Sequence, residues 1–131
     1  MTDITGFGLI GHLGEMLVAS GADATLDLAS IPLYEGAFTL AREGVTSTLL
    51  PENLALGYLL RGEFDAPSRA VLFDPQTSGG LLAGIPADSA AECVAELRAN
   101  GHGHAAIVGR VSATGLPASE VTVTASRCLQ H

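Results

Sequence analysis

The chain opens with Thr2-Asp3-Ile4-Thr5-Gly6-Phe7-Gly8, a stretch called motif 1 below. Apolar residues recur after it at helical spacing, and Gly21 supplies a stop, so residues 8–20 are expected to form an amphipathic helix. The first amide groups of a helix lack internal partners and carry partial positive charge. A glycine loop that leads into a helix N-terminus is therefore a candidate site for an anion such as phosphate.

A second stretch of similar composition, Asp74-Pro75-Gln76-Thr77-Ser78-Gly79-Gly80, is called motif 2 below. Apolar runs at 70–73 and 81–85 flank it, so it is predicted to be a loop between neighbouring strands. Its hydroxyl groups and its two glycines suit the close approach of a ligand to the backbone. Taken alone, a simple hairpin connection would account for this loop equally well.

The remaining pattern predicts an α+β domain, with helices packed on a mixed, mainly antiparallel sheet of four to five strands. Ser89 and Glu92 match a capping box, followed by an apolar helical stripe that ends at Gly101. The other expected elements are a strand at 24–29, a helix at 34–43, a helix opening at Pro51, strands at 105–111 and 121–124, and a turn at 115–117. At 131 residues, the whole chain 1–131 is expected to be a single domain.

The charge balance argues against nucleic acid as a partner. The chain has 14 acidic residues, six arginines and no lysine, for a net charge of −8, which would repel a phosphate backbone. Most of the excess lies in residues 1–66, so the cations for a phosphorylated ligand must come from metal or from another polypeptide. With two cysteines, no signal sequence and no long apolar run, we expect a cytoplasmic protein that does not enter a membrane.

Motif 1 suggests a metal site as well as a phosphate site. Asp3 could place one carboxylate on Mg²⁺ while backbone amides near Thr5, Gly6 and Gly8 face the phosphates that the metal bridges. A turn followed by a helix cap would explain the same residues without any ligand.

Other chemically active side chains give weaker signals, and no catalytic nucleophile is expected. His12 and Glu15 are interpreted as a surface or boundary pair rather than an acid/base couple. Cys93 lies on a predicted buried stripe, where a thiol is usually inert. The pairs His102/His104 and Cys128/His131 lack partner pairs at zinc-like spacing, so they are interpreted as loop and tail.

Taken together, residues 2–12 and 73–82 resemble the two signature stretches of the C-terminal domain of selenophosphate synthetase, also called selenide, water dikinase. Ile31-Pro32 and Pro51-Glu52-Asn53 also match landmarks of that family, so the resemblance covers essentially the whole chain. The wider superfamily includes aminoimidazole ribonucleotide synthetase, thiamine monophosphate kinase and the hydrogenase maturation dehydratase. Membership in any of them remains an alternative, because fold alone does not separate these enzymes.

The resemblance implies a fold like the C-terminal domain of aminoimidazole ribonucleotide synthetase, and an enzyme that makes selenophosphate, AMP and orthophosphate from ATP, selenide and water with Mg²⁺. It assigns Asp3 as a metal ligand. It places the ATP site between this domain and an N-terminal domain, and implies a homodimer for the full-length enzyme. The residues that it assigns to ATP binding are Thr5, Gly6, Gly8, Asp74, Gln76, Thr77, Ser78, Gly79 and Gly80.

The family's N-terminal half, with its reactive Cys or selenocysteine and a nearby Lys, is absent from this chain. We therefore expect little or no turnover by the chain alone, with its own N-terminal domain as the main partner. A non-catalytic module that binds a nucleotide or pairs with another protein is the alternative from a different functional class, and an exposed apolar patch would favour it.

Overall fold

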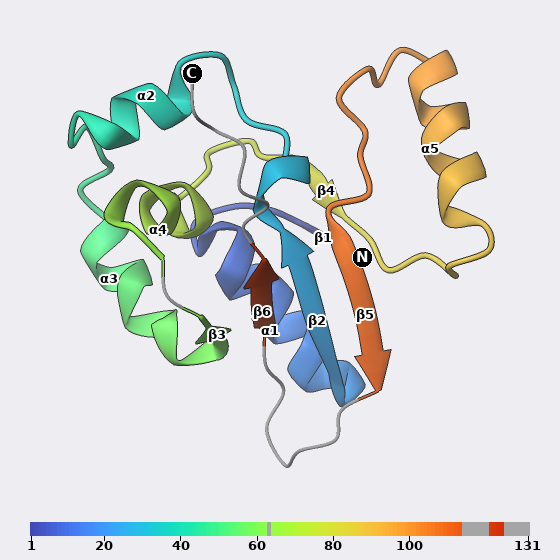
Figure 1. Ribbon diagram of the computed structural model, residues 1–131, viewed down its shortest axis with the longest axis horizontal. Coiled ribbons are helices and arrows are strands. Elements are labelled where there is room, and N and C mark those ends of the chain that lie inside the picture. The colour runs from blue at the N-terminus through green and yellow to red at the C-terminus, as the bar shows by residue number, and fades with distance from the viewer. Residues whose placement is uncertain (63, 114–120, 125–131) are drawn as a thin grey trace.

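A computed structural model describes residues 1–62, 64–113 and 121–124 of the chain, and within them five α-helices and two β-sheets (Figure 1). The helices are α1 (Gly8–Ser20), α2 (Ala37–Arg42), α3 (Leu50–Leu54), α4 (Ala66–Phe73) and α5 (Ala90–Ala99). The strands are β1 (Thr2–Asp3), β2 (Ala22–Asp27), β3 (Leu60–Arg61), β4 (Leu81–Leu82), β5 (Gly109–Ala113) and β6 (Val121–Thr124). Short 3₁₀ turns occupy Leu28–Ser30 and Ala55–Leu59.

The larger sheet has the strand order β3-β6-β2-β5, and β1 pairs with β4 in a separate two-stranded sheet. Strand β2 runs antiparallel to β5 and parallel to β6, which in turn runs parallel to β3. The α+β class and the mixed sheet are confirmed. Antiparallel pairs do not predominate, however, because two of the four pairings in the described residues are parallel. The intervening helices supply the long crossovers that parallel neighbours require.

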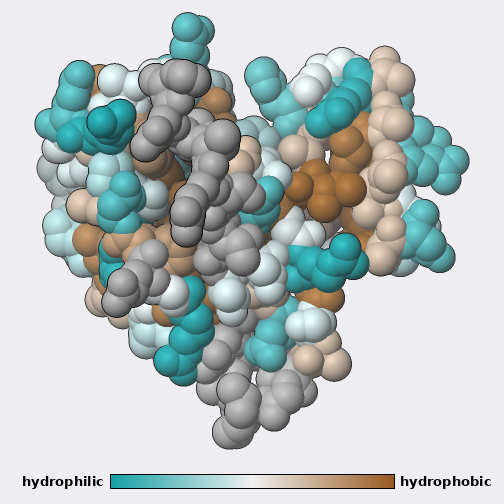
Figure 2. Space-filling view, in the orientation of Figure 1, coloured by the Kyte–Doolittle hydropathy of each residue, from teal (hydrophilic) through white to brown (hydrophobic). Residues whose placement is uncertain are grey.

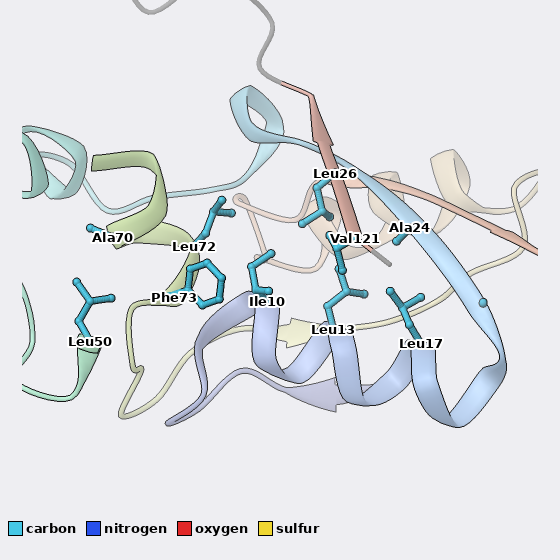
Figure 3. Close-up of a cluster of buried hydrophobic side chains, with 11 residues drawn as sticks. Ile10, Leu13, Leu17, Ala24, Leu26, Leu50, Ala70, Leu72, Phe73 and Val121 are labelled. Atoms are coloured by element: carbon cyan, nitrogen blue, oxygen red, sulfur yellow. The ribbon is translucent and has the colours of Figure 1, made fainter. Parts of the chain in front are cut away.

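Helix α1 forms as predicted and packs behind the larger sheet (Figures 1 and 3). It ends at Gly21, whose left-handed backbone (φ 59°) only glycine adopts without cost. Ile10, Leu13 and Leu17 share its buried face. They join one cluster with apolar side chains of the two central strands, Ala22, Ala24, Leu26 and Val121.

Residues 70–73 are wrongly predicted as a strand, since they form the last turn of α4. Asp65 accepts a hydrogen bond from the backbone N–H of Ser68, and Pro67 lies in the first turn, so the helix begins with two favourable signals. Leu72 and Phe73 are almost completely buried and extend the core toward α3 (Figure 3). Motif 2 is therefore a loop from a helix to a strand and not a hairpin between strands.

Helix α5 is present as predicted, but its apolar stripe is not buried. None of its ten residues, all within the described part of the chain, is buried, and Cys93 is half-buried. The capping box is also wrong in detail, because the Ser89 hydroxyl bonds to Asp88 and not to the helix backbone. Figure 1 shows α5 standing apart from the sheet, and Figure 2 shows apolar surface gathered beside it.

The other expected elements agree in kind and differ in extent. The helix expected at 34–43 spans Ala37–Arg42, and the helix expected at Pro51 begins at Leu50. The strand expected at 105–111 begins only at Gly109, whereas 121–124 is a strand as predicted. The turn expected at 115–117 lies outside the described residues. Among the helices of the described residues, none has the length and apolar character needed to cross a membrane.

A pair of substitutions on α1 tests this packing. Ile10 is fully buried, whereas Val18 on the same helix is 65% exposed. We predict that Ile10→Ala lowers the free energy of unfolding by about 2–5 kcal/mol, because it leaves a cavity in the core. Val18→Ala should change it by less than about 0.5 kcal/mol. Urea denaturation of both variants measures the difference, and equal losses would contradict the assignment of the buried face.

Candidate functional site

The two motifs, far apart in the sequence, lie against each other. Strand β1 at the start of motif 1 pairs with β4, which directly follows motif 2, and Asp3 lies opposite Leu81. The contact continues beyond the strands: the Ile4 N–H donates to the Gly80 carbonyl at 2.9 Å, and the Gln76 N–H donates to the Thr5 carbonyl at 3.1 Å. Both motifs therefore contribute to one surface, as the family resemblance implied.

The four glycines of the motifs fall into two groups. At Gly8 (φ 69°), a Cβ atom would lie 2.7 Å from the carbonyl carbon of Phe73, and at Gly79 it would overlap the carbonyl oxygen of Ile4. These two glycines allow the motifs to touch. At Gly6 and Gly80 a Cβ atom would meet nothing within 4 Å, and both residues are exposed. Only this second pair leaves open space beside the backbone.

A buried asparagine links motif 1 to the residue that precedes motif 2. Asn53, on α3, is 6% exposed, and its side-chain amide donates to the Gly6 carbonyl at 2.7 Å and to the Phe73 carbonyl at 2.9 Å. Phe73 immediately precedes motif 2. Asn53 was predicted only as part of a family landmark, and its role could not be inferred because both partners are distant in sequence.

His12 forms the predicted boundary pair with Glu15, and it also contacts motif 1, which was not predicted. It is 8% exposed, with Nε2 3.0 Å from the Thr5 hydroxyl oxygen and Nδ1 3.2 Å from a carboxylate oxygen of Glu15. The Phe7 ring lies 5.6 Å from the imidazole, centre to centre. The apolar spacing around His12 indicated a helix edge, but it gave no sign of a partner in the preceding loop.

The predicted ligand-binding residues differ in how accessible they are. Asp3, Thr77 and Ser78 are exposed, whereas Thr5 is half-buried. The exposed groups are thus a carboxylate and two hydroxyls at the rim of the joined motifs.

Asp74 is the titratable residue of motif 2. It is half-buried, and its carboxylate accepts a hydrogen bond from the Gln76 side chain at 2.7 Å. Loss of hydration on burial raises the pKa of Asp74, and the hydrogen bond from Gln76 opposes part of that increase.

The donor set fits Mg²⁺ as a partial site. Mg²⁺ usually keeps several waters and binds through one or two carboxylates together with substrate phosphates. The exposed carboxylate of Asp3 suits one such position. Within residues 1–62, 64–113 and 121–124, no group of three or more His, Cys, Asp or Glu side chains is placed to hold a metal. Cys128 and His131 lie outside the described residues.

Comparison with known proteins gives two kinds of match. The sequence model of the family described as "AIR synthase related protein, C-terminal domain" matches residues 1–122. Proteins named "Selenide, water dikinase" are also similar. The relative from Myxococcus xanthus is 44% identical over 92% of this chain and 35% of its own length. The relative from Clostridioides difficile is 36% identical over 88% of this chain and 34% of its own length. The resemblance drawn from the two motifs is confirmed, and the chain spans about a third of the length of these curated relatives.

Removing the Asn53 amide should loosen the joined motifs. We predict that Asn53→Leu lowers the free energy of unfolding by about 2–4 kcal/mol, because two carbonyl groups lose their donor. Asn100→Leu is the matched control: Asn100 is exposed and its amide makes one side-chain bond, to the Glu96 carbonyl, so its loss should cost less than about 1 kcal/mol. Urea denaturation compares the two, and similar losses would contradict the proposed role of Asn53.

The raised pKa of Asp74 predicts a pH-dependent difference in stability. Because folding disfavours the charged carboxylate, ionised Asp74 costs stability at neutral pH. Asp74→Asn should therefore be more stable than the wild type at pH 7, and the difference should disappear as the pH falls and Asp74 becomes protonated. Thermal unfolding at a series of pH values measures this, and a variant that is less stable at pH 7 would contradict it.

Proposed function

The chain belongs to the C-terminal domain family of AIR synthase related proteins, and from this premise we propose that it is the C-terminal domain of a selenophosphate synthetase. Such an enzyme makes selenophosphate, AMP and orthophosphate from ATP, selenide and water. The observation that carries the proposal is the junction of motifs 1 and 2, the two stretches that resemble this enzyme, into one surface. The curated relatives named selenide, water dikinase support the same choice within the superfamily.

In this proposal the domain forms one wall of a Mg²⁺-ATP cleft. Gly6 and Gly80 leave room for phosphate oxygens beside the backbone, and the hydroxyls of Thr77 and Ser78 stand at the rim as donors. Thr5, Gly8, Asp74, Gln76 and Gly79 shape the surface behind them. Asp3 is the metal ligand, and Mg²⁺ when bound neutralises charge on the polyphosphate. The contribution of the chain is positioning and electrostatics, on which phosphoryl transfer depends.

The rest of the cleft would come from the enzyme's own N-terminal domain. Neither motif contains a basic residue, and residues 1–66 hold most of the negative charge, so a polyphosphate needs cations from the opposite wall. The proposal therefore includes little or no turnover by the chain alone. It also includes a homodimeric full-length enzyme in the cytoplasm.

An apolar groove favours a second candidate, the non-catalytic module that pairs with a protein or binds a nucleotide. It has a volume of about 440 Å³ and runs along α1. Its lining includes the exposed side chains of Phe7, Val18 and Tyr58. Exposed apolar side chains gathered in this way are typical of contacts with other molecules.

A fusion experiment separates the candidates. This chain replaces the matching C-terminal segment of the Myxococcus xanthus relative, and AMP formation is measured with ATP, Mg²⁺ and selenide. We expect selenide-dependent AMP from the fusion and none from the chain alone. Turnover of selenide by the chain alone would overturn the half-cleft proposal, and tight Mg²⁺-ATP binding by the chain alone would favour the non-catalytic module. Activity of the fusion with another substrate only would indicate a different superfamily member.

Asp3 is the sharpest single test of the metal site. We predict that Asp3→Ala abolishes Mg²⁺-dependent AMP formation by the fusion, because a hard carboxylate ligand is lost. The free energy of unfolding should change by less than about 0.5 kcal/mol, since the side chain is exposed. Asp88→Ala, at another exposed aspartate away from both motifs, is the control and should keep full activity. Wild-type turnover of the Asp3 variant would refute the assignment.

A further inference from the structure

Three side chains contact one another in a series that ends at the candidate site, through an ion-pair contact and a hydrogen bond. The Glu15 carboxylate lies 3.2 Å from Nδ1 of His12, and Nε2 of the same ring lies 3.0 Å from the Thr5 hydroxyl oxygen. His12 is buried, the Glu15 side chain is 65% exposed, and Thr5 is half-buried within motif 1. The series therefore connects solvent on one side of α1 with the surface that the motifs share.

The position of each proton follows from whether each group can donate a hydrogen bond or only accept one. An ionised carboxylate only accepts hydrogen bonds, so the proton between Glu15 and His12 is on Nδ1. In the neutral ring Nε2 is then an acceptor, and the Thr5 hydroxyl must donate to it. With its proton directed to the imidazole, the Thr5 oxygen has only lone pairs left for another partner.

The hydroxyl of Thr5 does not have to hold the loop in place. The Thr5 carbonyl already does so, by accepting from the backbone N–H groups of Gly8 and Gln76. The Thr5 hydroxyl forms its side-chain bond with His12. Its effect is to orient the oxygen at the motif surface.

We propose that Glu15 and His12 are positioning residues that make the Thr5 hydroxyl an acceptor toward the cleft. This inference rests on the proposed function. An oriented acceptor there suits the donors carried by Mg²⁺-bound water, and it would not donate to a phosphate oxygen. Outer groups that orient a polar ligand in this way are common around metal sites, and their loss typically costs about 10- to 100-fold in metal affinity or activity.

The first test measures directly which nitrogen of the His12 ring carries the proton. Nitrogen NMR of the chain labelled with ¹⁵N-histidine distinguishes a protonated ring nitrogen from an unprotonated one, and His12→Gln identifies the signal. We expect the proton on Nδ1 in the wild type and in Glu15→Gln, whose amide oxygen still accepts. In Glu15→Ala we expect the proton to shift toward Nε2. A wild-type ring with its proton on Nε2 would overturn the proposal.

The second test reads turnover in the fusion described above. Glu15→Ala should lower kcat on the order of ten-fold and leave the KM for ATP nearly unchanged, whereas Glu15→Gln should restore most of the loss. Thr5→Val should lower kcat at least as much as Glu15→Ala, and Thr5→Ser should keep most activity. Glu92→Ala, at an exposed glutamate on α5, is the control for loss of surface charge.

The two readouts separate failure of this inference from failure of the proposed function. A changed ring state in Glu15→Ala with an unchanged kcat would show that His12 is only structural. If the wild-type fusion makes no selenide-dependent AMP, the proposed function fails. The ring state of the chain still decides in that case whether Thr5 is held as an acceptor.

Discussion

The pairing of β1 with β4 is the constraint on which the candidate site depends. Each strand has only two residues, and so short a sheet has little stability of its own. Its register is maintained by contacts on either side, through the Ile4–Gly80 and Gln76–Thr5 backbone bonds and through the Asn53 amide. Phe73, fully buried, anchors one end of this arrangement in the core. The geometry of the site is thus transmitted from the core through a few directional bonds.

Local signals in the sequence predict a helix that is bounded by glycines. They fail for a short apolar run, which fits a strand and a helical turn equally well. The limits of α1 follow from Gly8 and Gly21. An apolar run of four residues at 70–73 does not distinguish a strand from one helical turn. The cap at Asp65 and the proline at 67 would have favoured the helix. The parallel pairings of β6 involve residues distant along the chain, and no local pattern reports them.

For the candidate site, too, the sequence predicted one part and missed another. Composition identified both motifs, because glycine, hydroxyl and carboxylate groups are unusual together. It did not identify Asn53 or His12 as their supports, since a buried polar residue shows its partner only after folding. It predicted Gly79 only as a ligand-binding residue, whereas the structure shows that glycine at this position also accommodates the carbonyl of Ile4. A glycine-rich motif thus indicates that some group approaches the backbone closely, but only the folded structure shows which group it is.

The exposed and buried sides of the joined motifs support the proposal that this surface forms one wall of a cleft. Behind it, Gly8, Gly79 and Asn53 make close contacts and hydrogen bonds with other parts of the chain. In front, the polar side chains at the rim are the carboxylate of Asp3 and neutral hydroxyls. A polyphosphate needs positive charge that neither motif carries, and a rigid surface with one carboxylate gains affinity only when a cation bridges it to the ligand. Close contacts at the back and an unbalanced negative charge at the front support the proposal that this domain meets a cationic, metal-bearing partner.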